Sequence, residues 1–186
     1  MSDSAVLYEV GKALPYHGPR LEKDIVFETL SSLRVDALPP NDLARIRDQD
    51  ADDFGNPLVA TIVDSTGGTP LRCCLREARV GEQVALIAYQ PSKIGGPYAE
   101  VGPVFIHATA CAGYAAPDRY PDDFRPRRQL LRAYGADGGI VDATIVENGD
   151  QAEEACAAFL ARPDIAYIHS RNVLHGCYMF TVRRPA

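Results

Sequence analysis

The sequence predicts a single α+β domain with a largely antiparallel β-sheet and one or two short helices packed on it. Three observations support this fold class. Segments with strand character outnumber helical ones, most connections are short, and only one helix separates two strands late in the chain. That helix leaves a mixed sheet open as an alternative. The 186 residues suggest one domain, with an N-terminal extension at 1–25 and the domain at 26–186.

The first half of the domain alternates short extended segments with turns. Pro39 and Pro40 end the first segment, and a short helix over residues 42–47 follows them. The segment 71–81 starts extended and turns at its centre. The strands expected here are residues 26–35, 58–63, the start of 71–81, and 84–89, of which the last is a buried apolar run.

The second half contains the clearest local signals. Residues 129–134 and 140–146 flank the turn Gly135-Ala136-Asp137-Gly138-Gly139, which predicts a hairpin. Residues 151–161 form the best helix, with Asn148 or Asp150 as its cap. The remaining segments are strands at 102–109, 165–171 and 177–183 and a long irregular connection over 112–126.

Composition and charge limit the function classes. The net charge of −6 argues against general nucleic-acid binding, which requires a basic surface. The five cysteines have no spacing typical of a secreted disulfide framework. The N-terminus lacks a signal-peptide pattern, and no apolar run is long enough to span a bilayer. Because arginine far outnumbers lysine and alanine is frequent, we expect a bacterial protein. The net charge favours solubility, and the cysteine spacing and the missing signal-peptide pattern predict the reducing cytoplasm.

Several segments together resemble a known family. They are PLRCCL (70–75), ARVGE (78–82), GPVFIHA (102–108), the segment 130–139, and IAYIHSRNVLHGCY (165–178). In this order they are similar to the uncharacterised bacterial family DUF 1203, over roughly residues 58–184. The resemblance implies a small soluble bacterial protein and no particular reaction. In the family pattern a basic residue separates two cysteines, whereas this chain has Arg72-Cys73-Cys74.

The densest group of chemically capable side chains lies near the C-terminus. In an extended strand Tyr167, His169 and Arg171 share one face, which leads from core to a polar cleft. Arg171 and Asn172 are candidate ligands for a carboxylate or phosphate. Cys177 is a candidate nucleophile, activated by the imidazole two residues before it. In the structural alternative, His169 makes a hydrogen bond in the core, Arg171 and Asn172 fix the turn, and Cys177 is a small buried apolar side chain.

A second group lies in the middle of the chain. A guanidinium at Arg72 would lower the pKa of a neighbouring thiol, so Cys74 is a candidate nucleophile. If this segment is extended, one of the two adjacent cysteines faces the core and the other faces away. His107 ends a strand and is a candidate proton carrier. Arg132 is a further candidate for ligand binding.

Metal binding has weak support from spacing. His107, Cys111, His169, His175 and Cys177 are the residues considered for a Cys/His zinc site, but CxxC, HxxxH and HExxH patterns are all missing. We therefore expect no metal site, with a Cys/His metal-binding protein kept as an alternative.

Other tempting features are interpreted as structural. The acidic pairs Asp52-Asp53 and Asp122-Asp123 are interpreted as solvated charge. The basic run Arg125, Arg127 and Arg128 is interpreted in the same way, with a position facing an acidic ligand or partner as the alternative. The glycine turn at 135–139 lacks the lysine of a phosphate loop, and no Gly-x-Ser-x-Gly motif occurs.

The preferred hypothesis is a small-molecule cleft that binds or transforms an anion. It would form where residues 102–107 meet residues 165–177, with the connection 112–126 as a lid. Its catalytic candidates are Cys74, His107, His169 and Cys177, and its ligand-binding candidates are Arg72, Arg132, Arg171 and Asn172. The alternatives are a non-catalytic interaction or homodimerisation module and the metal-binding protein. The sequence specifies no cofactor and leaves open whether the protein is an enzyme; it predicts no nucleic-acid or membrane partner.

Overall fold

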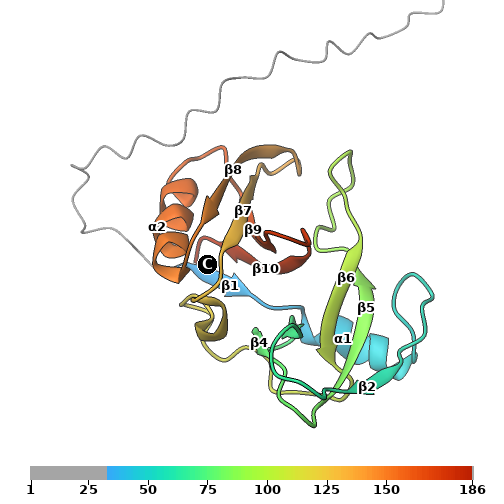
Figure 1. Cartoon of the computed structure of the whole chain (residues 1–186). Helices are drawn as coiled ribbons and strands as arrows, with labels where there is room; N and C mark the ends of the chain where they lie inside the picture. The colour runs from blue at the N-terminus through green and yellow to red at the C-terminus, as the bar shows by residue number, and fades with distance from the viewer. Residues whose placement is uncertain (1–32, 186) are drawn as a thin grey trace, which may run out of the picture.

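Two five-stranded sheets form the body of the protein, which is described here from a computed structural model over residues 33–185 (Figure 1). The expected extension 1–25 and the start of the first expected strand lie outside these residues. Sheet 1 has the order β1-β10-β9-β7-β8 and sheet 2 the order β2-β5-β6-β3-β4. The α+β class and the largely antiparallel pairing are confirmed, and the parallel pair β3–β6 makes sheet 2 mixed. The expectation of one sheet was wrong, since the strands divide between two.

The strands of sheet 1 agree closely with the sequence pattern. They are β1 (Arg34–Asp36), β7 (Gln129–Tyr134), β8 (Ile140–Val146), β9 (Tyr167–Asn172) and β10 (Tyr178–Arg183). The predicted hairpin is β7 and β8, whose turn places Gly138 at a φ of 82°, a region that favours glycine. Every neighbouring pair in this sheet is antiparallel.

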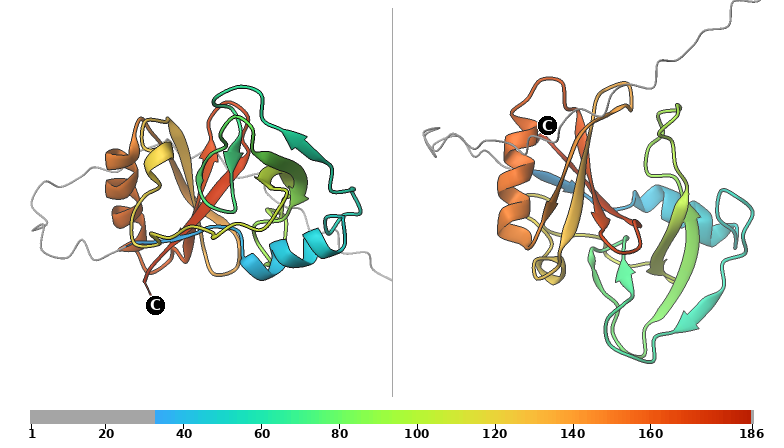
Figure 2. Two further views of the ribbon diagram at one scale, coloured as in Figure 1. Left: turned by 90° about the horizontal axis from the view of Figure 1, so that it is seen from below. Right: turned by 45° about the horizontal axis from the view of Figure 1, so that its top comes forward.

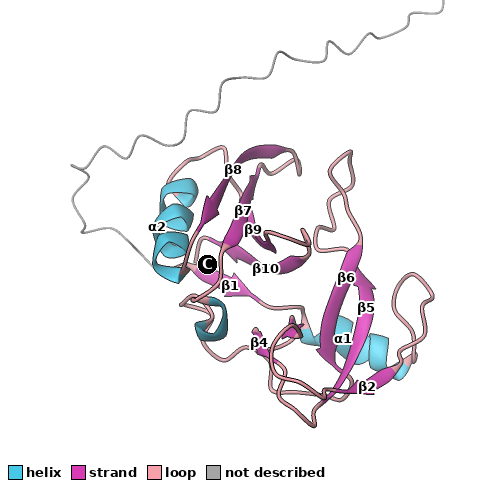
Figure 3. Ribbon diagram, viewed as in Figure 1, coloured by secondary structure: helices cyan, strands magenta, loops and turns pink. Residues whose placement is uncertain are grey.

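The strands of sheet 2 are shorter, except for its central pair (Figure 3). They are β2 (Ala60–Ile62), β3 (Pro70–Leu71), β4 (Arg76–Glu77), β5 (Gln83–Tyr89) and β6 (Gly102–His107). The strand predicted over 58–63 is reduced to the three exposed residues of β2, which lies at the edge of the sheet and pairs only with β5.

The two helices pack on different sheets, whereas the sequence placed them on the same one. Leu43 and Ile46 of α1 (Pro40–Asp48) join the core of sheet 2. Ala152, Cys156 and Phe159 of α2 (Gly149–Leu160) join the core of sheet 1. Both helices begin two residues before the predicted ranges of 42–47 and 151–161. The first extends one residue beyond its predicted end, and the second stops one residue short of it. None of the described helices is long and apolar enough to cross a membrane.

The two cores are connected by short segments in which neighbouring residues face opposite sheets. Val35 lies in the core of sheet 1 and Leu38 in that of sheet 2, as the chain passes from β1 to α1 (Figure 2). In the turn after β3 the chain passes back between the cores, since Cys73 lies in the core of sheet 2 and Leu75 in that of sheet 1. In β10, Tyr178 belongs to the core of sheet 2 although its strand lies in sheet 1.

The long connection 112–126 is packed into the protein along its second part. Its short 3₁₀ helix η2 (Asp122–Phe124) ends at Phe124, which is buried and stacks on Phe180 with a ring-centroid distance of 6.2 Å. Tyr120 is also buried. These two aromatic side chains anchor the segment, so residues 120–124 do not form a free lid.

Candidate functional site

A cavity of roughly 710 Å³ is lined by residues from both sheets. Its walls come from the region of β3, β5 and β6 on one side and from the loop between β9 and β10 on the other. The lining residues are Gly68, Pro70, Arg72, Leu86, Pro103, Phe105, Arg127, Arg128, Asn172, Val173, Leu174, His175 and Cys177. This set has three arginines, one histidine and several apolar side chains, and none of its members is an acid.

Arg72 is the buried cation of this cavity. Its residue is only 3% exposed, its Nε donates to the Tyr178 carbonyl over 2.8 Å, and Nη1 donates to the Pro70 carbonyl. Within residues 33–185 no carboxylate lies at ion-pair distance from it. Burial lowers the pKa of Arg72 to about 10, which still leaves the guanidinium charged at neutral pH.

Two further arginines reach the cavity but already have acidic partners. Arg127 pairs with Glu77 and lies over the ring of Phe124, 5.4 Å from its centroid. Arg128 Nε donates to Glu147 over 3.0 Å. The sequence interpretation of this run as solvated charge therefore missed its position beside the cavity, because the approach of residues 127–128 to the β9–β10 loop is a long-range contact.

The loop between β9 and β10 is held by Asn172, the last residue of β9. Asn172 Oδ1 accepts hydrogen bonds from the backbone N–H groups of Leu174 and His175, both over 2.9 Å. Gly176 has a φ of 68°, which favours glycine. The Cys177 thiol donates to the His175 carbonyl over 3.7 Å, so its recorded partner is the backbone and not the imidazole. Asn172 thus acts on the loop, while His175 and Cys177 face the cavity.

Two of the predicted anion ligands instead share an acid of their own. Arg171 pairs with Glu100 and also donates from Nη2 to the Gly176 carbonyl over 2.6 Å. Arg132 Nη1 lies 3.9 Å from the other oxygen of Glu100. Arg171 lines a smaller, adjoining cavity of roughly 210 Å³, which includes Glu100 and shares Pro103, His175 and Cys177 with the first cavity. Because Glu100 neutralises charge there, this position is less suited to an anion than Arg72 is.

His169 lies in the core and not in the cavity. It packs among Tyr134, Tyr167 and Tyr178, with ring-centroid distances of 4.7, 5.1 and 5.1 Å, and its Nδ1 has no hydrogen-bond partner among the described residues. Burial, reinforced by nearby arginines, lowers its pKa to about 3. The imidazole is therefore neutral at physiological pH and is poorly placed to transfer protons to a ligand.

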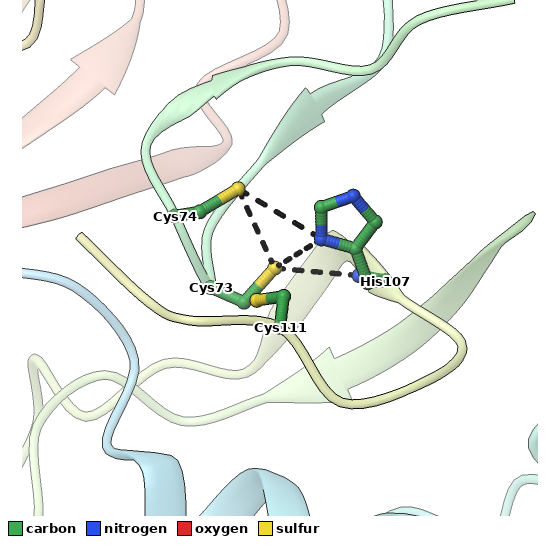
Figure 4. Close-up of side chains that lie close together, drawn as sticks. All are labelled: Cys73, Cys74, His107 and Cys111. Atoms are coloured by element: carbon green, nitrogen blue, oxygen red, sulfur yellow. Dashed lines mark hydrogen bonds between the residues drawn. The ribbon is translucent and has the colours of Figure 1, made fainter. Parts of the chain in front are cut away.

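A second constellation brings together Cys73, Cys74, His107 and Cys111 (Figure 4). Their ligand-capable atoms all lie within 4.8 Å of one another. The two adjacent cysteines come from the turn after β3, the histidine ends β6, and Cys111 lies four residues further along the chain. The sequence grouped His107 and Cys111 with His169, His175 and Cys177, but the structure groups them with the adjacent cysteines.

Both adjacent thiols point to the same place because the chain turns there. The sulfur atoms of Cys73 and Cys74 lie 3.9 Å apart, and Leu75 has a φ of 55°, which is unusual for leucine. The sequence placed the two thiols on opposite faces only if this segment were extended, and residues 72–75 instead form a turn. Cys73 is buried, Cys74 is half-buried and Cys111 is exposed, so the constellation has one open side.

The electrostatics of these thiols differ from the sequence interpretation. The hydrogen bond between the two thiols, followed by burial, raises the pKa of Cys73. The same hydrogen bond lowers the pKa of Cys74, and the guanidinium of Arg76 contributes in the same direction. The predicted neighbour Arg72 points instead toward the cavity. Arg76 was not a candidate, because its approach depends on the turn at residues 72–75.

The ring of His107 is held between the thiols and an ion pair. Its Nδ1 lies 3.4 Å from the Cys73 sulfur and 3.8 Å from the Cys74 sulfur. Its Nε2 lies 3.5 Å from a Glu82 oxygen and 3.2 Å from Arg76 Nη2. Burial is the main cause that lowers the pKa of His107.

Comparison with known proteins gives a family but no activity. A family model described as a protein of unknown function, DUF1203, matches residues 68–184. No curated protein and no solved structure matches the chain. All residues that line the cavity and all four residues of the cysteine constellation lie within the matched range.

Proposed function

The chain belongs to the DUF1203 family, and we propose that this protein binds a small organic anion in the cavity between its two sheets. The observation that carries the proposal is the charge of the lining: three arginines and no acid, in a protein whose net charge is −6. The ligand would combine a carboxylate or phosphate with an apolar body, because Phe105, Leu86 and Leu174 supply apolar walls.

Arg72 is the proposed anchor. A buried cation without an acidic partner is costly, and an anionic ligand would provide the missing charge. A guanidinium also binds carboxylates and phosphates through paired hydrogen bonds. Its bonds to the carbonyls of Tyr178 and Pro70 fix the side chain before the ligand arrives. Arg127 and Arg128 would strengthen the positive potential while remaining bound to their own acids.

Binding can be tested with benzoate as a probe, since it combines a carboxylate with an apolar ring. Benzoate should stabilise the full-length protein against heat, by about 1.4 kcal/mol when present at tenfold its dissociation constant. Benzamide, which has the same shape without the charge, should have little effect. Arg72→Gln should lose the response to benzoate, whereas the surface variant Arg119→Gln should keep it.

The outcome is informative even if Arg72→Gln is less stable than the original protein. Arg72→Lys retains the charge and loses the paired geometry, so it should respond to benzoate more weakly than the original protein does. Equal stabilisation by benzoate and benzamide, or an unchanged response in both Arg72 variants, would contradict the proposal.

Cys177 is the proposed nucleophile if the protein also transforms the anion that it binds. Its half-buried thiol lines the same cavity as Arg72. Alkylation of Cys177 by iodoacetamide, followed by peptide mass spectrometry, should slow when benzoate is added. A parallel sample with benzamide in place of benzoate serves as the control, and there the rate of Cys177 alkylation should not change. A nucleophilic role requires in addition that Cys177→Ser bind the anion normally.

Homodimerisation is a second candidate function, favoured by the exposed edge of sheet 1. The edge strand β8 carries Ile140, Val141 and Ile145, which are 37%, 37% and 47% exposed. Unpaired edges of this kind can pair with a second sheet. Light scattering coupled to size exclusion tests this, and a monomer at high concentration would exclude it.

We also propose a bacterial, cytoplasmic location, in which the thiols remain reduced. All five cysteines are free. Because disulfides are rare in the reducing cytosol, free cysteines that lie close together support this compartment.

A further inference from the structure

We infer that Cys73, Cys74, His107 and Cys111 form a tetrahedral zinc site, separate from the anion cavity. The spacing of these residues in the sequence gave no reason to expect a metal. The inference comes from the arrangement of four donor atoms, from the support of the histidine, and from the chemistry of the donor set.

The three distances among the donor atoms of Cys73, Cys74 and His107 are close to those of a metal tetrahedron. A zinc ion bound at about 2.3 Å from sulfur and about 2.0 Å from nitrogen holds two sulfurs about 3.8 Å apart, and a sulfur and a nitrogen about 3.5 Å apart. In this protein the sulfurs of Cys73 and Cys74 are 3.9 Å apart. His107 Nδ1 lies 3.4 and 3.8 Å from them. Cys111 Sγ completes the set, with all four atoms within 4.8 Å of one another.

The second ring nitrogen of His107 faces the ion pair of Glu82 and Arg76. A histidine bound through Nδ1 carries its proton on Nε2, and that proton is commonly donated to a carboxylate. Glu82 Oε2 lies 3.5 Å from Nε2, and Arg76 Nη2, which holds the same carboxylate, lies 3.2 Å from Nε2. Glu82 is in turn fixed by Arg76, through contacts of 2.7 and 2.9 Å, and by the Arg79 backbone N–H. Glu82 is therefore a positioning residue for the ligand histidine.

The backbone around the site is also arranged for thiolates. The His107 N–H donates to the Cys73 sulfur over 3.3 Å, which favours the negative form of sulfur. Arg47 fixes the end of β6 by donating to the His107 carbonyl over 3.3 and 3.1 Å. The guanidinium groups of Arg47 and Arg76 would partly balance the negative charge left by three thiolates and one divalent ion.

Three thiolates and one imidazole form a donor set that is typical of structural zinc. All four ligands come from the protein, so no position remains for water or substrate. The site would tie the turn after β3 to the end of β6 and to the segment that leaves it. Cys111, which is exposed, gives the ion its path of entry.

The first test is elemental analysis of the untagged, full-length protein purified under reducing conditions. We expect about one zinc per chain. Cys111→Ser should lose this zinc after dialysis against a chelator, whereas Cys177→Ser, which changes a thiol outside the site, should retain it. Because Cys111 is exposed, its variant should keep the far-ultraviolet circular dichroism of the original protein. Absence of zinc, iron in its place, or equal retention by both variants would overturn the inference.

The second test uses cobalt as a spectroscopic probe. Co²⁺ added to the metal-free protein should give the intense visible absorption of tetrahedral cobalt bound to thiolates, saturating at about one equivalent per chain. Glu82→Gln should weaken zinc binding by roughly 10- to 100-fold, since it removes the carboxylate behind His107, and should leave the shape of the cobalt spectrum unchanged. An octahedral cobalt spectrum would exclude the proposed geometry.

Discussion

At the scale of single residues, burial assigns different roles to side chains that look equivalent in the sequence. His107 and His169 are both buried histidines on strands, yet of the two only His107 contacts an acid and thiols among the described residues. Arg72 and Arg171 are both buried arginines, yet only Arg171 has an acidic partner at ion-pair distance in the described part of the chain. The chemistry of each residue therefore depends on what packs against it.

His169 should make the protein sensitive to acid. The unfolded chain binds a proton at this residue near pH 6.5, whereas the folded protein binds it only near pH 3. Unfolding takes up a proton between these values, so the stability contribution is complete above about pH 6.5 and falls as the pH decreases, by up to about 1.4 kcal/mol per pH unit. Urea unfolding at a series of pH values measures this slope. In His169→Phe the slope between pH 6.5 and 4 should be shallower, and an identical slope would contradict the assignment.

At the scale of elements, two polar side chains fix the ends of a helix and a loop. Asn148 begins α2, as one of the two predicted caps, by accepting a hydrogen bond from the Gln151 N–H over 3.0 Å. Asp52 is 5% exposed and accepts hydrogen bonds from the N–H groups of Phe54, Asn56 and Ala88. The interpretation of Asp52 as solvated charge was wrong, because β5 folds back over its loop.

Removing the cap of α2 should cost a moderate amount of stability. Asn148→Ala leaves the Gln151 N–H without its acceptor, and the expected loss is about 1 kcal/mol in the free energy of unfolding. Asn148→Ser, which keeps a side-chain acceptor, should lose much less. Denaturant unfolding of both variants measures the difference, and equal losses would argue against capping as the cause.

The two adjacent acids Asp52 and Asp53 offer a matched comparison. Asp52→Ala should lower the free energy of unfolding by about 1–3 kcal/mol, because it leaves buried N–H groups unsatisfied. Asp53→Ala removes only a surface ion pair with Arg45 and should cost below about 1 kcal/mol. Hydrogen exchange of the Ala88 amide should accelerate in the first variant alone.

At the scale of the whole molecule, the chain links its two cores through residues that alternate between them. Tyr178 has its backbone in sheet 1 and its ring in the core of sheet 2, where it lies 6.4 Å from the ring of Tyr89. The Arg72 side chain bonds to the carbonyl of the same residue. These shared contacts favour unfolding of both sheets together.

Tyr178→Ala tests this coupling. Removal of the buried ring should cost about 3–5 kcal/mol. The hydrogen exchange of amides in β5 and in β9 should then accelerate by the same factor, because both sheets open in one transition. Tyr178→Phe, which loses only the hydroxyl bond to Thr181, serves as the control. Acceleration confined to one sheet would show that the sheets unfold separately.

The sequence by itself determined the fold class, the β7–β8 hairpin, both helices and most strand positions. These features depend on local patterns of apolar residues, caps and turns, which the chain displays directly. It also identified Arg72, Asn172, His107 and Cys177 as chemically capable residues. It did not determine which of them lie together.

Only the tertiary structure decided the division into two sheets and the composition of both sites. The cavity joins residues 68–105 to residues 127–177, and the cysteine constellation joins Cys74 to His107 across 33 positions. Such contacts depend on how sheets pack and on one turn at Leu75 with an unusual φ. Sequence spacing cannot reveal them, because strand pairing and core packing are set by the burial of the whole chain and not by neighbours along it.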